Sequence, residues 1–237
     1  MSWTAVQYTD KGQVRSLNED SVLDHGQQHL WVVADGMGGH EAGDYASQHV
    51  VSSLSRYQQH AKPGVSMSRL RELMTISNTH LVEKAETENL GTVGCTVAAL
   101  NIASLDIMCS WSGDSRIYRL RAGNLRQLTR DHNYGALLED RNRVQFPHAS
   151  EEDSELLTAA IGGEALMHLE HCWFSLQPSD KFLLCTDGLY KEMEDAEIES
   201  ILNEEHDPDL IVNSLADLYR QRGARDNVGI MYVYAGV

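Results

Sequence analysis

Residues 30–40 read LWVVADGMGGH and give the strongest structural signal in the sequence. The run from Leu30 to Ala34 is apolar and predicts a buried strand, which ends on the carboxylate of Asp35. Glycines follow at positions 36, 38 and 39, so the backbone there can turn sharply or approach a ligand closely. A carboxylate at the end of a buried strand, beside backbone without side chains, suits a hard divalent cation.

The same arrangement recurs elsewhere in the chain. Residues 182–187 read FLLCTD and end on Asp187, and residues 107–114 read IMCSWSGD and end on Asp114. Asp226 opens another apolar run, DNVGIMYVY, from its other side. One aspartate of this kind is ordinary, because aspartate is common in turns. Several of them indicate that the strands converge and gather their carboxylates, whose mutual repulsion a divalent metal would relieve.

Length and composition limit the class of protein. The chain has 237 residues, of which 42% are hydrophobic, so it can form one domain with a large core or two small ones. Its formal net charge of -16 argues against a nucleic-acid partner and against an anionic membrane surface. No apolar run is long enough to cross a bilayer, and the first residues lack the pattern of a signal peptide. We therefore expect neither nucleic acid nor a membrane as a partner.

The cysteines all fall in apolar, strand-like runs: Cys95, Cys109, Cys172 and Cys185. None forms a CxxC pair, and no spacing of cysteine and histidine typical of zinc sites occurs. Buried free thiols are typical of proteins in a reducing compartment. The sequence therefore predicts free thiols and a cytoplasmic location.

The predicted elements alternate between groups of strands and pairs of helices. Strands are expected at residues 3–8, 14–23, 30–34, 94–103, 105–112, 116–121, 125–129, 167–176, 181–185 and 228–234. Helices are expected to begin near residue 41, to span 67–88 and 194–205, and to begin again at residues 207–208. Because short turns join most successive strands, this order favours an α+β domain with antiparallel sheets and separate helices.

Residues 131–157 differ from the rest because they are polar, irregular and interrupted by Pro147. A long segment with little regular structure is more often a functional loop or lid than a plain connector. Arginines cluster just before it, in the hairpin predicted at residues 116–130. They form either a solvated hairpin face or a surface that contacts a phosphopeptide.

Short motifs occur in the following order along nearly the whole chain: VRSLNEDS, VVADGMGGH, GCTVAAL, WSGDSRIYRL, LTRDH, FLLCTDGL and ARDNV. Together they resemble the metal-dependent serine/threonine protein phosphatases of type 2C in their compact bacterial form. The resemblance implies one domain over residues 1–237, a four-layer α-β-β-α sandwich of two antiparallel sheets flanked by helix pairs. It places a metal site at one end of the sandwich and a flap beside that site at residues 131–157.

The resemblance also implies which residues hold the metal ions. Asp35 would bridge two tightly bound ions, one of which the carbonyl of Gly36 would also bind. Asp187 and Asp226 would complete the site of the other ion, and Glu19 would act through a water molecule. Because all these donors are oxygen atoms, the expected ions are Mn²⁺ or Mg²⁺ and not zinc.

Further residues have roles around this centre by the same resemblance. Asp114 and Asp187 would hold a weaker third ion, while Asp20 and Asn227 would lie next to the ligands and support them. Arg15 matches the arginine that binds the phosphate of the substrate.

The sequence departs from the family pattern near the site. Met37 stands where animal members carry a histidine that is proposed to protonate the leaving group. His40, His132 or a water on the metal could supply that proton instead, and both histidines could equally be structural. Cys95 and Gly229 replace common threonines, but neither change removes a metal ligand.

The activity implied is hydrolysis of phosphoserine and phosphothreonine in proteins by a metal-activated water, without a phosphoenzyme. The expected partners are phosphorylated proteins and a serine/threonine kinase that the enzyme opposes, and the chain is expected to be a monomer. Two alternatives come from other classes, namely a signalling module without catalytic activity and a metallohydrolase of small phosphate esters. Loss of a metal aspartate would favour the first and a missing flap the second, and the sequence shows neither.

Overall fold

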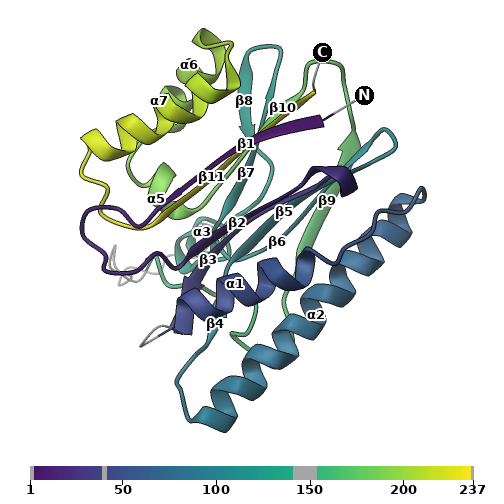
Figure 1. Cartoon of the computed structure of the whole chain (residues 1–237), viewed down its shortest axis with the longest axis vertical. Helices are drawn as coiled ribbons and strands as arrows, with labels where there is room; N and C mark the ends of the chain where they lie inside the picture. Colours follow the sequence, from purple (N-terminus) through teal and green to yellow (C-terminus); the bar gives the residue numbers. More distant parts are fainter. Residues whose placement is uncertain (1–2, 39–41, 141–153, 236–237) are drawn as a thin grey trace.

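The computed structural model describes residues 3–38, 42–140 and 154–235. In these ranges the chain forms two antiparallel β-sheets stacked face to face, with helices on both outer faces (Figure 1). The layers therefore run helix, sheet, sheet, helix, which confirms the predicted α-β-β-α sandwich. None of the helices in the described ranges is long and apolar enough to span a bilayer.

The first sheet has five strands in the order β1, β11, β10, β7, β8. Their bounds are β1 (Trp3–Asp10), β7 (Arg116–Arg121), β8 (Asn124–Gln127), β10 (Lys181–Cys185) and β11 (Val228–Ala235). The last strand in the sequence, β11, lies between β1 and β10 and pairs with both. The outer face is covered by α6 (Asp195–Glu204) and α7 (Pro208–Gln221), and the short α5 (Asp187–Tyr190) follows β10 (Figure 1).

The second sheet has the order β2, β3, β5, β6, β9, with the short β4 also paired to β3. Its strands are β2 (Asp20–His25), β3 (Leu30–Met37), β4 (Gly94–Cys95), β5 (Val97–Ala103), β6 (Asp106–Ser112) and β9 (Glu170–Ser175). The short 3-10 turn η1 (Gly26–Gln28) joins β2 to β3. The outer face is covered by the two helices α1 (Ala42–Leu54) and α2 (Pro63–Glu88) (Figure 1).

Apolar side chains fill the space between each pair of layers. Trp31 and Val33 from β3 meet Phe182 from β10 between the two sheets, while separate clusters lie under each helix pair. Strands in such a sandwich are buried on both faces, so they read as continuous apolar runs and not as alternating ones. The cysteines are free, as expected; Cys172 is half-buried and the others are buried.

The strand predicted at residues 14–23 is wrong in its first part, because only β2, from Asp20 onward, is extended in a sheet. The preceding loop is held instead by the side chain of Asn227, whose Nδ2 donates to the carbonyls of Lys11 (2.9 Å) and Leu17 (2.8 Å). An amide side chain thus replaces the sheet partner that these backbone groups would otherwise need.

The segment at residues 131–157 is more regular than the sequence suggested. Helix α3 (Tyr134–Asp140) occupies its first part, and a bridge between Asn133 and Leu157 brings its two arms together. The expectation of little regular structure is therefore wrong for residues 134–140. Residues 141–153 lie outside the described part of the chain.

Candidate metal centre

Aspartates from separate strands meet at one end of the sandwich. They come from the start of β2, the end of β3 and the turns beside β6, β10 and β11: Asp20, Asp35, Asp114, Asp187 and Asp226. Asp20 and Asp35 lie opposite each other in the β2–β3 ladder. The charges of Asp114 and Asp187 act on Asp35, and the charge of Asp226 acts on Asp20. The strands thus converge on one cluster of carboxylates, as their sequences predict.

The carboxylates in this cluster oppose one another's ionisation. Burial raises the pKa of Asp35 well above its ordinary value, and the charges of Asp20 and Asp187 raise it further. Burial also raises the pKa of Asp114 to about 7, with the charge of Asp187 as the next cause. Such a cluster binds protons at pH values where isolated aspartates are ionised. A divalent cation would compensate these charges.

Asp20 has an unsatisfied oxygen that fits this interpretation. Its Oδ2 accepts a hydrogen bond of 2.7 Å from the hydroxyl of Thr186, while its Oδ1 is buried and has no hydrogen-bond partner within the described residues. A buried polar atom without a partner is costly. Since the other possible metal ligands around it are carboxylate oxygens, the residues present fit a hard cation such as Mn²⁺ or Mg²⁺.

The backbone at Asp35 and Gly36 is fixed from both sides. The amide of Thr96 donates to the carbonyl of Asp35 at 2.8 Å, and the amide of Gly36 donates to the carbonyl of Glu19 at 3.0 Å. A Cβ on Gly36 would overlap the carbonyl of Gly43 in α1. Only glycine therefore lets the end of β3 approach α1 this closely.

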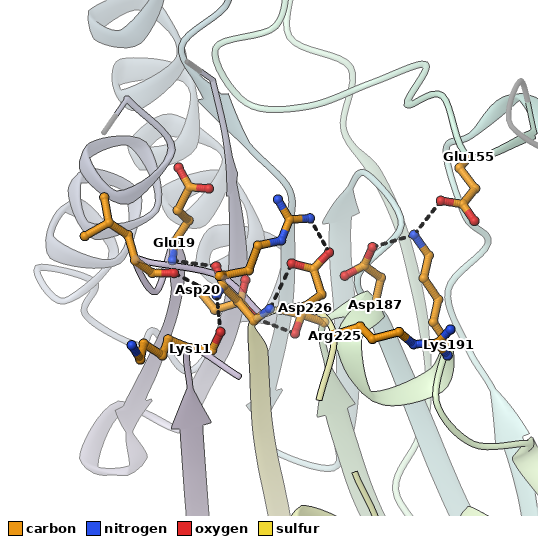
Figure 2. A network of polar contacts seen from close by, with 12 residues as sticks. Lys11, Glu19, Asp20, Glu155, Asp187, Lys191, Arg225 and Asp226 are labelled. Carbon is orange, nitrogen blue, oxygen red and sulfur yellow. Dashed lines mark hydrogen bonds and ion pairs between the residues drawn. The ribbon is translucent and has the colours of Figure 1, made fainter. Parts of the chain in front are cut away.

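Two basic side chains neutralise part of the cluster. Nη2 of Arg15 lies 2.7 Å from Oδ2 of Asp226, and Nζ of Lys191 lies 2.8 Å from Oδ2 of Asp187. Figure 2 shows Asp187 and Asp226 side by side, with Lys191 reaching from Asp187 to Glu155 on the far side. The predicted phosphate-binding residue Arg15 is thus at the site, bound here to a carboxylate.

Asn227 connects the loop that carries Arg15 and Glu19 to the start of β11. Its Oδ1 accepts a hydrogen bond of 2.8 Å from the amide of Glu19, in addition to the bonds that its Nδ2 donates to the same loop. Burial raises the pKa of Glu19, while the charge of Arg15 opposes this. Asn227 therefore holds the loop that carries Arg15 and Glu19, and it directly follows Asp226 in the sequence.

Of the two histidines predicted near the site, the structure describes His132 and not His40. His40 lies outside the described residues. His132 is buried, and its Nδ1 accepts a hydrogen bond of 3.2 Å from the amide of Gly113, next to Asp114. Nε2 of His132 and Nε2 of His168 each lie 3.6 Å from Oε1 of Glu170. Because Nδ1 of His132 accepts this hydrogen bond, the neutral ring carries its proton on Nε2, the nitrogen that faces Glu170.

Arginines of the β7–β8 hairpin are engaged within the protein. Arg116 binds Asp131 through Nε and Nη2, and its guanidinium lies 3.5 Å from the ring centroid of Tyr190. Arg121 makes two hydrogen bonds of 2.6 Å to the buried Asp180. These two residues are structural, so the hypothesis of a phosphopeptide surface does not extend to them.

A groove adjoins the carboxylate cluster. It has a volume of about 420 Å³ and begins at Met37 and Gly38, directly after Asp35 and Gly36. Its other wall is formed by the segment after the undescribed residues, including Glu155, Leu157 and Glu164. A peptide next to a phosphorylated residue could lie in a groove of this size.

Sequence reasoning missed Thr186 and Lys191. Thr186 lies between an apolar strand and Asp187, so its hydroxyl is expected to be buried. A buried hydroxyl needs a hydrogen-bond partner, and this is the signal in the sequence that points to Thr186. Lys191 follows Asp187 by four positions, a spacing at which opposite charges on a helical turn meet. Glu155 carries no signal, because its contact with Lys191 depends on the tertiary fold.

The chain matches the protein phosphatase 2C family over residues 11–223. It belongs to this family. The serine/threonine protein phosphatase PstP of Mycobacterium tuberculosis is 32% identical over 228 residues, which cover 94% of this chain and 43% of PstP. This chain thus spans less than half of the length of that relative. The serine/threonine phosphatase stp of Listeria monocytogenes is 32% identical over 238 residues, covering 95% of this chain and 93% of the relative.

Solved structures of protein phosphatase 2C relatives agree with the fold. PppA, described as a key regulatory component of T6SS in Pseudomonas aeruginosa, superposes with a TM-score of 0.92 at 35% identity, covering 100% of this chain and 99% of that one. The catalytic domain of PstP in complex with two manganese ions gives 0.86 at 30% identity, covering 98% and 97%. The family and the sandwich fold expected from the sequence motifs are therefore confirmed.

Proposed function

We propose that the chain hydrolyses phosphoserine and phosphothreonine in proteins with the help of divalent metal ions. The observation that carries this proposal is the cluster of converging, buried and half-buried carboxylates, in which Asp20 has an oxygen without a hydrogen-bond partner among the described residues. In this assignment Asp35 bridges two ions, the carbonyl of Gly36 binds one of them, and Asp187 and Asp226 bind the other. Both Mn²⁺ and Mg²⁺ suit these donors.

Glu19 and Asp114 complete the proposed assignment of metal-binding residues. Glu19 acts through a water molecule, and Asp114 together with Asp187 holds a weaker third ion. Asp20 and Asn227 support these ligands through the contacts described above. When bound, the ions supply Lewis-acid activation of water and compensation of negative charge.

Arg15 binds the phosphoryl group of the substrate in this proposal. Its side chain is about half exposed, at 53%, and its guanidinium already binds a carboxylate, Asp226. The planar fork of arginine matches phosphate oxygens as well as carboxylate oxygens. Arg15 can therefore exchange Asp226 for the phosphoryl group of the substrate.

The groove beside Met37 and Gly38 supports a protein substrate over a small phosphate ester. A small ester would use only the cluster itself, whereas a peptide would extend into the groove. Proteins phosphorylated by a serine/threonine kinase are accordingly the proposed substrates, with that kinase as the opposing enzyme. We further propose that the chain acts in the cytoplasm as a monomer and forms a single domain with a flap at residues 131–157.

Phosphate release from a phosphothreonine peptide and a phosphotyrosine peptide tests the proposal. We expect turnover of the phosphothreonine peptide with Mn²⁺, loss of turnover with a chelator, and recovery when Mn²⁺ is added back. Full activity in the metal-free protein would contradict the proposed metal centre. Hydrolysis of nitrophenyl phosphate without hydrolysis of any phosphopeptide would favour the small-ester alternative, and saturable metal binding without any turnover would favour a signalling module.

A further inference from the structure

Lys191 bridges two carboxylates that belong to different parts of the site. Its Nζ lies 2.8 Å from Oδ2 of Asp187 and 3.0 Å from Oε2 of Glu155 (Figure 2). Asp187 belongs to the carboxylate cluster, whereas Glu155 lines the groove that begins at Met37. One ammonium group thus joins the proposed metal centre to the wall of the proposed substrate groove.

The ammonium group of Lys191 lies where it must affect a bound cation. A metal ion binds a carboxylate oxygen at about 2.0–2.6 Å, and Oδ2 of Asp187 is already in contact with Nζ. An ion on this carboxylate and the ammonium group would therefore be neighbours and repel each other. Lys191 has a second carboxylate partner, Glu155, so its positive charge stays paired when it leaves Asp187.

We propose that Lys191 is a positioning residue that competes with the metal ion for Asp187. In the metal-free chain it neutralises Asp187, and in the loaded chain it yields that oxygen and stays with Glu155. Occupancy of the metal site would then decide which carboxylate Lys191 binds. Because Glu155 lines the groove, this choice would also change the charge on the groove wall. This inference rests on the proposed function, because it assumes that Asp187 is a metal ligand.

The size of the expected effect follows from Coulomb's law. Even in a water-like dielectric, a positive charge about 4 Å from a divalent cation changes its binding constant by at least about tenfold. Of the two tight ions, the one assigned to Asp187 should show the effect, because Lys191 contacts Asp187 directly. The weaker third ion, which is also assigned to Asp187, should change in the same direction. A general change of surface charge would instead weaken or strengthen both ions.

Calorimetric titration of the whole chain with Mn²⁺ tests the inference. In Lys191→Met we expect one of the two tight ions to bind about tenfold more strongly than in the wild type. The matched control is Lys84→Met, which removes a lysine that is also paired four positions away, with Glu88 at 2.6 Å on α2. This control should bind both ions as the wild type does. Unchanged or weaker binding in Lys191→Met would overturn the inference.

Glu155→Gln gives a second variant with an effect of opposite sign. Without the carboxylate of Glu155, Lys191 has only Asp187 as its partner, so the same ion should bind several-fold more weakly. Misfolding cannot produce stronger binding in one variant and weaker binding in the other. If the wild type binds no Mn²⁺ saturably, the proposed function fails as well. If the wild type binds Mn²⁺ and releases phosphate but both variants bind alike, only the role of Lys191 is refuted.

Discussion

Arg15 and Asp226 form a hydrogen-bonded ion pair of 2.7 Å across 211 positions of sequence. The pair joins the loop before β2 to the turn before β11 and neutralises one carboxylate of the cluster. Both partners have roles in the proposed reaction, one toward the phosphoryl group and the other toward a metal ion. The variants below separate these roles.

Asp35→Asn and Asp226→Asn should each reduce phosphopeptide hydrolysis by more than about 100-fold. Replacing a residue that only hydrogen-bonds to a metal ligand already lowers activity by about 10- to 100-fold, and replacing a ligand should cost more. Asparagine keeps the size of the side chain but removes the charge that compensates the cation, so the fold should survive. Circular dichroism checks the fold, and calorimetry counts the ions. Wild-type stoichiometry in Asp35→Asn would argue against a bridging role for this residue.

Asp114→Ala should leave the two tight ions in place and lower turnover by about 10- to 100-fold. Asp114 follows β6, where the charge of Asp187 acts on it, and matches only the position of the third ion. Crystals of this variant soaked in Mn²⁺ should show two ions. A variant that binds no tightly held ion would mean that Asp114 belongs to the central pair of sites.

His40→Ala should slow hydrolysis of a phosphothreonine peptide by about 10²–10⁴ if His40 is the general acid. The alkoxide of threonine is a strongly basic leaving group and needs a proton, whereas nitrophenolate does not. Hydrolysis of nitrophenyl phosphate should therefore change little. The ratio of the two losses in kcat/KM is the quantity to measure. A ratio near one would remove His40 and favour a water molecule on the metal as the proton donor.

His132→Gln should reduce the pH dependence of stability. Burial lowers the pKa of His132 below its ordinary value of 6.5, so the folded state disfavours its protonation. The stabilising contribution is complete above pH 6.5 and is lost as the pH falls below that value, by at most about 1.4 kcal/mol per pH unit. Urea unfolding at pH 7.5, 6.5 and 5.5 measures the slope. An equal slope in the variant and the wild type would show that His132 titrates alike in both states.

Gly188→Ala should destabilise the chain by about 1–3 kcal/mol, because overpacking of a closed contact forces the backbone to move. A Cβ at this position would overlap the carbonyl oxygen of Asn227, and the shift would displace Asp187 as well. Gly64→Ala is the matched control, since a Cβ there meets nothing within 4 Å. Denaturant unfolding compares the two variants, and equal stability in both would contradict the close approach at Gly188.

The sequence predicts much of this fold because its strands are buried on both faces. Continuous apolar runs such as residues 30–34 and 182–185 mark the centre of the sandwich, and the aspartates at their ends mark the site. The strand predicted at residues 14–19 is instead a loop, because the side chain of Asn227, more than 200 positions away, satisfies its backbone. Glu155 was missed for the same reason, since its partner lies on another segment.

The central position of β11 determines when the molecule can assemble during synthesis. Within the described ranges, β1 pairs with β11 alone, which is made more than 200 residues later. Until β11 has emerged from the ribosome, β1 has no neighbour in its sheet and Arg15 has no Asp226 to bind. Long-range pairing of this kind slows folding and leaves apolar strand edges exposed. The nascent chain should therefore be prone to aggregation and lack the proposed activity until β11 has emerged from the ribosome.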